Sequence, residues 1–333
     1  MCNFHALVKF TAKEDGVEYF TAVTAAEPNA CPVPPRTGSL VDAYHTLEQF
    51  QSGSNPKQVT VDNLLAPLAQ TNLPIYCVGL NFRSHAKEAK LTLTNYPTLW
   101  NKPARALANP DEDIPVNEFC ATSLLDYEGE LVFVTSKEAK NVTRAEAASY
   151  ILGYTIGNDL SCRMFQLAKY SGGQYFFAKG FDKFAPLGPV LISQKQYEAT
   201  TRGRRLTTRV NGEVVQDVEL AKDMIFSPEQ ILSHMSQGES ANGLEHLTTL
   251  SRVVTERRSP PGTTIPAGTA VMMGTPAGVG AFRSPKRFLR DGDKVEVEVS
   301  AIGVLSNVVR FENVSLWGRF KVEVIQLFLR LFT

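Results

Sequence analysis

Short runs in which apolar and polar residues alternate recur along this 333-residue chain, and tight-turn signals join several of them. HALVKF and VEYFTAV flank the turn-like KEDG, while TTRV and EVVQD flank Asn211-Gly212, a strong two-residue hairpin signal. IYCVGL, ELVFV, TAVMMGT and DKVEVEV have the composition of further strands. Because strands outnumber helices and are often hairpin-linked, the pattern predicts a β-rich α+β fold with a mostly antiparallel sheet.

The strand pattern also predicts how the chain is divided. Residues 1–73 are expected to form a small N-terminal β unit, with a hairpin near residues 5–25, and a proline-rich linker containing one helix, LVDAYHTLEQF (40–50). Residues 74–312 are expected to form the main domain. Its polar segment 238–262 is interpreted as an inserted loop, either solvated or placed near the functional site.

Two helices are predicted from local signals. TRAEAASYIL (143–152) opens with Thr143 and Glu146, which match a capping box. Residues 313–333 are predicted to form an amphipathic C-terminal extension. Its apolar stripe, at helical spacing, consists of Phe320, Val324, Leu327, Phe328 and Leu331. We expect this stripe to pack on the domain or on a partner subunit; binding to a membrane surface is less favoured, because the polar face carries few basic residues.

Charge and composition exclude several classes of protein. The 34 basic residues balance 34 acidic ones, which argues against a nucleic-acid partner, since phosphate contacts need a basic surplus. No apolar run is long enough to span a membrane, and the N-terminus lacks the apolar core of a signal peptide. The five cysteines form no Cys-x-x-Cys pair. We therefore expect a cytoplasmic protein, with a mitochondrial location as the alternative.

The strongest candidates for chemistry are three carboxylates, Glu128 and Glu130 in DYEGELVFV and Asp159 in IGNDL. In a strand, side chains at i and i+2 project to the same side, so the two glutamates can reach one point. Carboxylates without nearby Cys or His suit Mg²⁺ or Mn²⁺, with Ca²⁺ as an alternative. Glu296 and Glu298 have the same spacing in VEVEV, where a solvated strand face explains it. Spacing alone thus leaves the metal site open.

A second candidate is His85 with Glu88, in NFRSHAKE. On a helix, residues at i and i+3 are neighbours, so the carboxylate can orient the imidazole while the ring takes a proton from water. A surface histidine with an ordinary helical neighbour is the alternative.

Three further polar residues follow in the same region. Arg163 and Gln166, in SCRMFQ, are again at i and i+3, and this combination suits recognition of a substrate carboxylate. Lys179 follows the apolar run YFFA, where a half-buried lysine can polarise an oxygen. A lysine that extends its ammonium group to the surface is the alternative.

The segment MMGTPAGVG (272–280) is neither a Walker loop nor a dinucleotide-binding glycine motif. A strand that ends at Gly274-Thr275-Pro can offer a hydroxyl and backbone N–H groups to an oxyanion. A tight structural turn explains the same residues.

Taken together, these segments resemble the fumarylacetoacetate hydrolase family over roughly residues 75–312. The matching segments, in order, are CVGLNFRSHAKE, LDYEGELVFV, GYTIGNDLSCRMFQ, FFAKGFDKFAPLGP, TRVNGEVVQD, MMGTPAGVG and DGDKVEVEV. The resemblance implies a catalytic domain built as a mixed β-roll, usually dimeric, that acts on small anionic keto acids or diketones. It further implies one Mg²⁺ or Mn²⁺ ion held by Glu128, Glu130 and Asp159.

The resemblance also implies roles for the remaining candidates. His85, oriented by Glu88, would activate water. Lys179, Thr275 and backbone N–H groups such as that of Gly274 would hold the oxyanion.

Substrate binding is implied for three more residues. Arg163 and Gln166 would bind the acid group of the substrate. Lys102, in LWNKP, matches a family lysine near the site.

The chain departs from the family pattern at three positions near these residues. Phe82 stands where a tyrosine is frequent, Met164 where many members have an acidic residue, and Gly180 where a serine is frequent. The carboxylates and the His-Glu pair are kept, so the changes affect the expected substrate pocket. They favour a substrate that is larger or less polar than a small acylpyruvate.

We therefore predict a metal-dependent hydrolase that cleaves a C–C bond in an acylpyruvate or related 1,3-dicarbonyl acid. The alternative on the same site is a decarboxylase of β-keto acids such as oxaloacetate, or a tautomerase or isomerase, which needs no attacking water. A noncatalytic binding protein on an enzyme fold is the second alternative.

Overall fold

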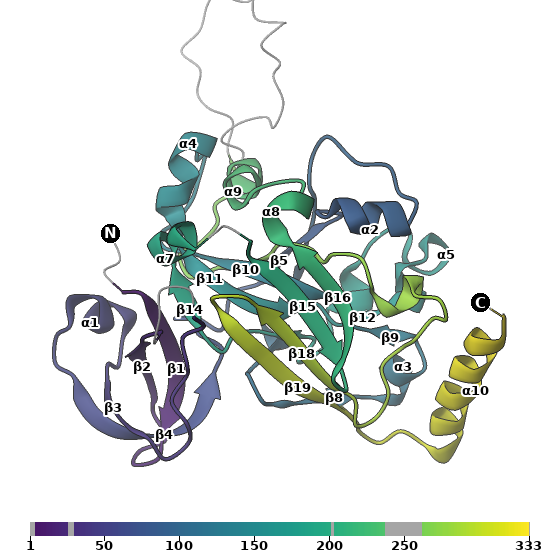
Figure 1. Cartoon of the computed structure of the whole chain (residues 1–333), viewed down its shortest axis with the longest axis horizontal. Helices are drawn as coiled ribbons and strands as arrows, with labels where there is room; N and C mark the ends of the chain where they lie inside the picture. Colours follow the sequence, from purple (N-terminus) through teal and green to yellow (C-terminus); the bar gives the residue numbers. More distant parts are fainter. Residues whose placement is uncertain (1–3, 26–29, 201–202, 237–261, 333) are drawn as a thin grey trace, which may run out of the picture.

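The computed structural model describes residues 4–25, 30–200, 203–236 and 262–332. Two β-sheets packed face to face form the body of the protein (Figure 1). The inserted loop predicted at 238–262 lies outside the described residues, apart from Gly262. Within the described part of the chain, no helix is long and apolar enough to cross a membrane.

The larger sheet has ten strands in the order β3-β4-β1-β14-β11-β10-β17-β5-β6, with β2 paired to β1. Its strands are β1 (Ala6–Ala12), β2 (Glu18–Val23), β3 (Leu40–Ala43), β4 (Lys57–Leu65), β5 (Ile75–Gly79), β6 (Thr98–Lys102), β10 (Gly129–Thr135), β11 (Ile151–Asn158), β14 (Leu191–Ser193) and β17 (Ala270–Met272). The strands of the predicted N-terminal unit are thus joined to the main sheet through the pairing of β1 with β14.

The smaller sheet has five strands in the order β16-β15-β18-β19-β8. Its strands are β8 (Asp113–Val116), β15 (Arg205–Val210), β16 (Glu213–Glu219), β18 (Lys294–Val299) and β19 (Gly303–Phe311). Two short pairs complete the β structure, β9 (Leu125–Asp126) with β12 (Ser161–Cys162) and β7 (Leu107–Ala108) with β13 (Ala185–Pro186). Among the described pairings only β5–β17, β7–β13 and β8–β19 are parallel, which confirms the mostly antiparallel β-rich fold.

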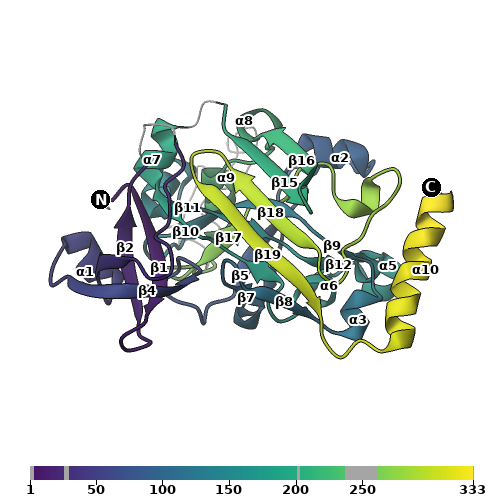
Figure 2. The ribbon, with the colours of Figure 1, turned by 60° about the horizontal axis from the view of Figure 1, so that its bottom comes forward.

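Alternation along β10 and β11 explains how the sheets pack. Leu131 and Phe133 of β10, with Ile156 of β11, belong to the same core as Leu206 and Val297 of the smaller sheet. Val132 and Val134 face the opposite side, where a second core forms. Figure 2 shows β18 and β19 crossing over β10 and β11. One face of β10 therefore packs against the smaller sheet, and the other packs in the second core and carries Glu130 near the start of the strand.

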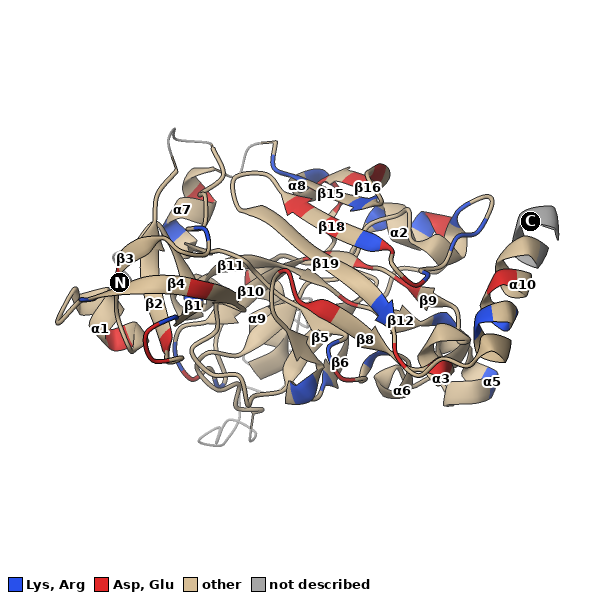
Figure 3. Cartoon of the chain, turned by 90° about the horizontal axis from the view of Figure 1, so that it is seen from below, with Lys and Arg blue, Asp and Glu red and all other residues tan. Residues whose placement is uncertain are grey.

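The helices are short and cover the sheets and their ends. They are α1 (Leu47–Ser52), α2 (Arg83–Glu88), α3 (Glu118–Ala121), α4 (Arg144–Ala147), α5 (Ala168–Ser171), α6 (Phe176–Lys179), α7 (Gln194–Ala199), α8 (Leu220–Asp223), α9 (Pro228–Ser236) and α10 (Leu316–Phe332). Charged residues of both signs are interspersed in the view of Figure 3.

Two predicted helices differ from the structure. The first half of the segment 40–50 is strand β3, because Leu40 to Ala43 pair with β4, and the helix begins only after Thr46, whose side chain accepts from Gln49 N–H. The predicted capping box of Thr143 and Glu146 is confirmed. The helix that it starts is shorter than predicted, since one 3₁₀ turn leads directly into the buried strand β11.

Helix α10 packs through a different face from the one predicted. Phe320, Val324 and Leu327 are 55%, 45% and 58% exposed, whereas Val322 and Gln326 are buried. The Gln326 amide group donates to the Phe288 carbonyl at 2.9 Å and also accepts from the Phe288 N–H. Phe320, Val324 and Leu327 therefore do not pack on the domain, because a specific polar contact fixes the opposite face. Packing of the stripe on a partner subunit stays a prediction.

Candidate active site

The two glutamates of the E-x-E motif point away from the smaller sheet because Gly129 between them faces it. A Cβ atom at Gly129 would lie 2.2 Å from Thr208 Oγ1, so no larger residue fits there without a shift. Glu130 lies opposite Gly157 in the β10–β11 pairing. At the end of this pairing, the Asp159 N–H donates to the Glu128 carbonyl at 2.8 Å, which brings the third carboxylate alongside.

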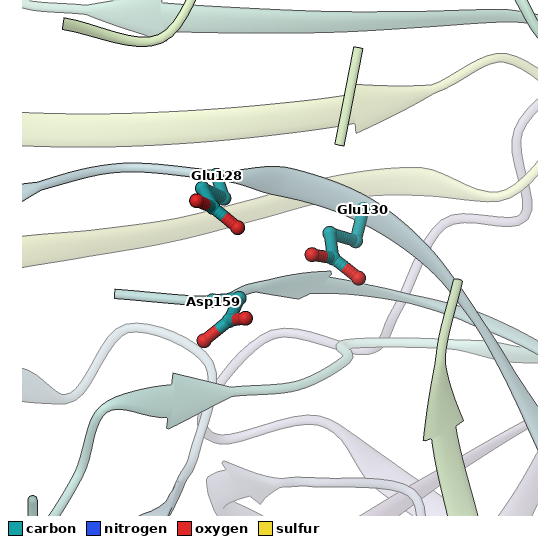
Figure 4. Close-up of side chains that lie close together, drawn as sticks. All are labelled: Glu128, Glu130 and Asp159. Atoms are coloured by element: carbon teal, nitrogen blue, oxygen red, sulfur yellow. The ribbon is translucent and has the colours of Figure 1, made fainter. Parts of the chain in front are cut away.

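The three predicted carboxylates form one buried cluster (Figure 4). One oxygen from each of Glu128, Glu130 and Asp159 lies within 4.8 Å of the others, and the residues are at most 5% exposed. Three buried carboxylates without a nitrogen or sulfur ligand form a donor set for a hard dication. The residues present therefore fit the metal ion that the sequence implies.

Two predicted lysines and an arginine neutralise this cluster. Lys179 Nζ lies 2.8 Å from Glu128 Oε2 and 2.6 Å from Asp159 Oδ2. Lys102 Nζ lies 2.5 Å from Asp159 Oδ1, and Arg163 Nη1 lies 2.5 Å from Glu128 Oε1. Lys102 is completely buried, and its ammonium also donates to the backbone carbonyl of Phe184 at 2.5 Å. In this structure the cations contact the carboxylates directly.

Burial and charge separate the pKa values of the two glutamates. Burial raises the pKa of Glu128, but the attraction of Lys179 and Arg163 outweighs it and lowers that pKa to about 2. The pKa of Glu130 is raised well above its usual value by burial and by the negative charges of Asp159 and Glu128. A nearby dication would offset the negative charges that raise the pKa of Glu130.

Arg163 is held in place by more partners than the sequence suggested. Its Nε donates to Asp126 Oδ2 at 2.7 Å, and its Nη1 donates to Gln166 Oε1 at 2.9 Å. Asp126 is completely buried and also accepts from the N–H groups of Gly280 and Ala281. Among the described residues, Arg163 Nη2 has no hydrogen-bond partner although it is buried. A substrate carboxylate would satisfy this donor.

The predicted His-Glu pair is formed on helix α2. His85 Nδ1 lies 2.8 Å from Glu88 Oε1, and Glu88 Oε2 accepts from the Gly278 N–H at 2.9 Å. Glu88 therefore fixes the imidazole to the loop that follows β17. The Phe282 ring meets the His85 ring edge to face, with the centroids 5.8 Å apart.

The Gly274-Thr275 turn is tied into the same structure. The Gly274 N–H donates to Glu130 Oε2 at 2.7 Å. The Thr275 hydroxyl donates to the Gly129 carbonyl at 2.9 Å and accepts from Gln216 Nε2 at 2.8 Å. Both groups that were predicted to hold an oxyanion therefore have partners inside the protein, and they connect the turn to the E-x-E strand.

Sequence reasoning missed Asp126 and Gln216. Asp126 lies two residues before Glu128, just as Glu128 lies two residues before Glu130. This regular spacing could have identified Asp126 as a candidate. Gln216 is buried, and its Oε1 accepts from the Gly129 N–H at 3.0 Å. Gln216 lies in the strand after the Asn211-Gly212 turn, and this position does not indicate a role in the site.

Residues 74–310 match the family model described as the fumarylacetoacetate (FAA) hydrolase C-terminal domain. The chain belongs to the fumarylacetoacetate hydrolase family. The members of this family are enzymes, and they generally depend on a divalent metal ion. The buried carboxylate cluster lies inside the matched region.

Individual family members show how varied the activities are. The chain is 32% identical to a fumarylacetoacetate hydrolase domain-containing protein 2 homolog of Dictyostelium discoideum, over 81% of this chain and 82% of that protein. It is 32% identical to the oxaloacetate tautomerase YisK of Bacillus subtilis (strain 168), over 74% and 72%. It is also 32% identical to a caffeoylpyruvate hydrolase of Neonothopanus nambi, over 83% of each chain.

A solved structure agrees with this assignment to the fumarylacetoacetate hydrolase family. The 5-carboxymethyl-2-hydroxymuconate delta-isomerase of Mycobacterium smegmatis is 25% identical and superposes with a TM-score of 0.66. The superposition covers 92% of this chain and 99% of that one. Hydrolases, tautomerases and isomerases thus share the fold.

Proposed function

We propose that the chain is a Mg²⁺- or Mn²⁺-dependent hydrolase that cleaves a C–C bond in an acylpyruvate or a related 1,3-dicarbonyl acid. The observation that carries this proposal is the convergence of three buried carboxylates within 4.8 Å, together with an Arg163 Nη2 that lacks a partner among the described residues. The first group suits a dication, and the second suits the carboxylate of a keto acid.

Glu128, Glu130 and Asp159 would hold the ion, which supplies Lewis-acid stabilisation of the negative charge that develops on the dicarbonyl oxygens. Arg163, with Gln166 beside it, binds the substrate carboxylate and so fixes where the dicarbonyl lies. Lys179 remains close enough to stabilise a negatively charged oxygen, because its ammonium already lies between Glu128 and Asp159.

Water activation is assigned to the His-Glu pair. Glu88 binds the Nδ1–H of His85, so the other ring nitrogen is able to take a proton from water. The hydroxide adds to the acyl carbonyl, the C–C bond to the neighbouring CH₂ breaks with its electron pair leaving on the enolate of pyruvate, and the enolate carbon takes up a proton. The products are the carboxylate of the acyl group and pyruvate, with one proton released.

A second candidate is an oxaloacetate tautomerase, and the similarity to the Bacillus subtilis enzyme of that name favours it. That reaction moves a proton and needs no water addition. Decarboxylation of a β-keto acid is a further alternative on the same groups. A noncatalytic binding role would require that the cluster holds no ion.

The deciding experiment compares two reactions of the purified, Mg²⁺-loaded protein. Pyruvate release from acetylpyruvate and benzoylpyruvate is followed with coupled lactate dehydrogenase, and ketonisation of enol-oxaloacetate is followed by absorbance. We expect pyruvate release, and its loss by at least about 10²-fold in His85→Ala. Ketonisation without any pyruvate release would contradict the hydrolase assignment, and absence of both reactions and of calorimetric metal binding would favour a binding protein.

The cytoplasmic location and the homodimer stay predictions. Cell fractionation followed by immunodetection tests the location. Light scattering of the purified protein tests the homodimer.

A further inference from the structure

The helix that carries His85 takes its N-terminal cap from a distant part of the chain. Helix α2 begins at Arg83 after Phe82, whose ring has no oxygen that could cap the helix. Asp223, the last residue of α8, instead accepts from the Ser84 N–H at 2.9 Å. We propose that Asp223 is a positioning residue that holds His85 in the place where it activates water. The inference rests on the role of His85 in the proposed function.

The Asp223 carboxylate contacts Ser84 twice. Its Oδ1 accepts from the backbone N–H, which at the second position of the helix is a group that a capping side chain normally satisfies. Its Oδ2 accepts from the Ser84 hydroxyl. Because a backbone group and a side-chain group of the same residue are both held, the first turn of α2 is fixed in position and in rotation. His85 is the next residue of that turn.

The Ser84 hydroxyl also connects α2 to the loop that follows β17. Its oxygen accepts from the Ala277 N–H at 3.1 Å. Glu88, at the other end of the helix, accepts from the Gly278 N–H at 2.9 Å. Both ends of the short helix are thus attached to adjacent residues of one loop, and His85 lies between the two attachment points.

The same loop connects α2 to the carboxylate cluster. Its Thr275 hydroxyl donates at 2.9 Å to the carbonyl of Gly129, the residue between the two glutamates. His85 lies close enough to Glu128 for their charges to interact. The contacts of Asp223 therefore help to set the distance between the imidazole and the cluster, and the addition of water to a dicarbonyl bound there depends on that distance.

The backbone behind Asp223 is itself held in place. The residues that follow it run beside the residue that precedes Phe82. The Phe226 N–H donates to Asn81 Oδ1 at 2.7 Å, and the Ile225 N–H donates to the Asn81 carbonyl at 2.8 Å. Asn81 is completely buried. The carboxylate is therefore presented to α2 from a fixed segment, as a positioning role requires.

The test is a double-mutant cycle in the full, Mg²⁺-loaded protein. Asp223→Asn keeps the size of the side chain and the acceptor for the Ser84 N–H, but its NH₂ group cannot accept from the hydroxyl. We expect kcat for pyruvate release from benzoylpyruvate to fall about ten- to hundredfold, while KM changes less than about twofold. In the His85→Ala background the same substitution should lower kcat less than about twofold, because the group that it positions is gone.

Two variants of Ser84 separate the hydroxyl from the cap. Ser84→Ala keeps the backbone N–H but removes the hydroxyl, and it should lower kcat about three- to tenfold. Ser84→Thr keeps both groups and should stay within about twofold of the wild type. These two variants decide the matter if Asp223→Asn does not fold: equal kcat values for them would overturn the inference.

Glu219→Gln is the matched control. Glu219 directly precedes α8, and its carboxylate pairs at 2.7 Å with Lys222 of that helix, a lysine that is 76% exposed. The control should keep the kcat and KM of the wild type. The inference is overturned by an unchanged kcat in Asp223→Asn, or by a loss that is equally large with and without His85. Either result leaves the hydrolase assignment in place.

A spectroscopic measurement tests the placement of His85 without turnover. The chain has five histidines, so labelling them with ¹⁵N and comparing the spectrum with that of His85→Ala identifies the ring nitrogens of His85. We expect Asp223→Asn to shift the resonance of Nδ1, the nitrogen that Glu88 binds, and Glu219→Gln to leave it unchanged. If no diketo acid is cleaved but the resonance shifts, the proposed reaction fails and the positioning role stands; an unchanged resonance in Asp223→Asn overturns the positioning role.

Discussion

The substitution Lys179→Met removes the cation that bridges two buried carboxylates. Lys179 is 2% exposed, and its ammonium lies 2.8 Å from Glu128 and 2.6 Å from Asp159. Methionine keeps much of the volume of lysine but carries no charge. Among the described residues, the Glu128 carboxylate then keeps Arg163 as its ionic partner, and Asp159 keeps Lys102. We expect the metal-free protein to lose stability because a buried carboxylate loses its compensation.

The pKa of Glu128 gives the magnitude. Its fall from 4.5 to about 2, against the opposing effect of burial, corresponds to about 3 kcal/mol at about 1.36 kcal/mol per pKa unit. Lys179 is the larger of the charges that lower this pKa, so we expect Lys179→Met to reduce the free energy of unfolding by about 2–4 kcal/mol at pH 7. Since the pKa is lowered on folding, this contribution is complete above about pH 4.5 and is lost as the pH falls towards 2.

Urea unfolding followed by far-UV circular dichroism, in EDTA, measures the effect. Lys183→Met is the matched control, because Lys183 pairs with Glu112 at 2.7 Å but both side chains are about one-third exposed. Such a surface pair contributes less than about 1 kcal/mol. The reasoning is refuted if the two variants lose the same stability at pH 7, or if the loss in Lys179→Met does not shrink between pH 7 and about pH 3.

Three other predictions concern the neighbouring groups. After EDTA treatment and removal of the chelator, added Mg²⁺ should raise the urea midpoint of the wild type by an amount equivalent to about 2.7 kcal/mol at a hundredfold excess over Kd, and Asp159→Asn should abolish this rise, as followed by circular dichroism. Thr275→Val should lower thermal stability by about 1–3 kcal/mol, because the Gly129 carbonyl and Gln216 Nε2 lose a partner, and Thr275→Ser should keep most of it in calorimetry. Asp126→Asn should raise KM for benzoylpyruvate more than it lowers kcat, because Asp126 orients Arg163 at 2.7 Å; steady-state kinetics showing an unchanged KM would contradict this role.

The carboxylate cluster was predictable because its geometry is mostly local. Strand alternation places Glu128 and Glu130 on one side, and the strand that pairs with β10 ends beside them at Asp159. The lysines could be placed near the site from the resemblance. The carboxylate that each lysine contacts depends on how far its side chain extends between three strands and a helix. No pattern in the neighbouring sequence predicts these contacts.

The errors have the same origin. An amphipathic stripe predicts burial only if the hydrophobic effect decides which face of a helix packs. In α10 the contacts of Gln326 with Phe288, and the close approach of Gly318 to Glu118, fix the other face. The segment 40–50 was misassigned because its first half pairs with strand β4, whose paired residues lie 14 to 20 positions further along the chain, from Ala43–Lys57 to Leu40–Thr60. Non-local pairing overrides propensity in both cases.

The choice between hydrolase and tautomerase lies outside the carboxylate cluster. Both reactions need a stabilised enolate, so Glu128, Glu130 and Asp159 serve either one equally well. A hydrolase needs in addition a base that activates water and space for an acyl group that leaves as an acid. The structure supports the first requirement at His85, whose Nδ1 lies 2.8 Å from Glu88 Oε1. Because a tautomerase adds no water, His85→Ala should lower kcat for the cleavage of acetylpyruvate and benzoylpyruvate far more than it lowers the ketonisation of enol-oxaloacetate.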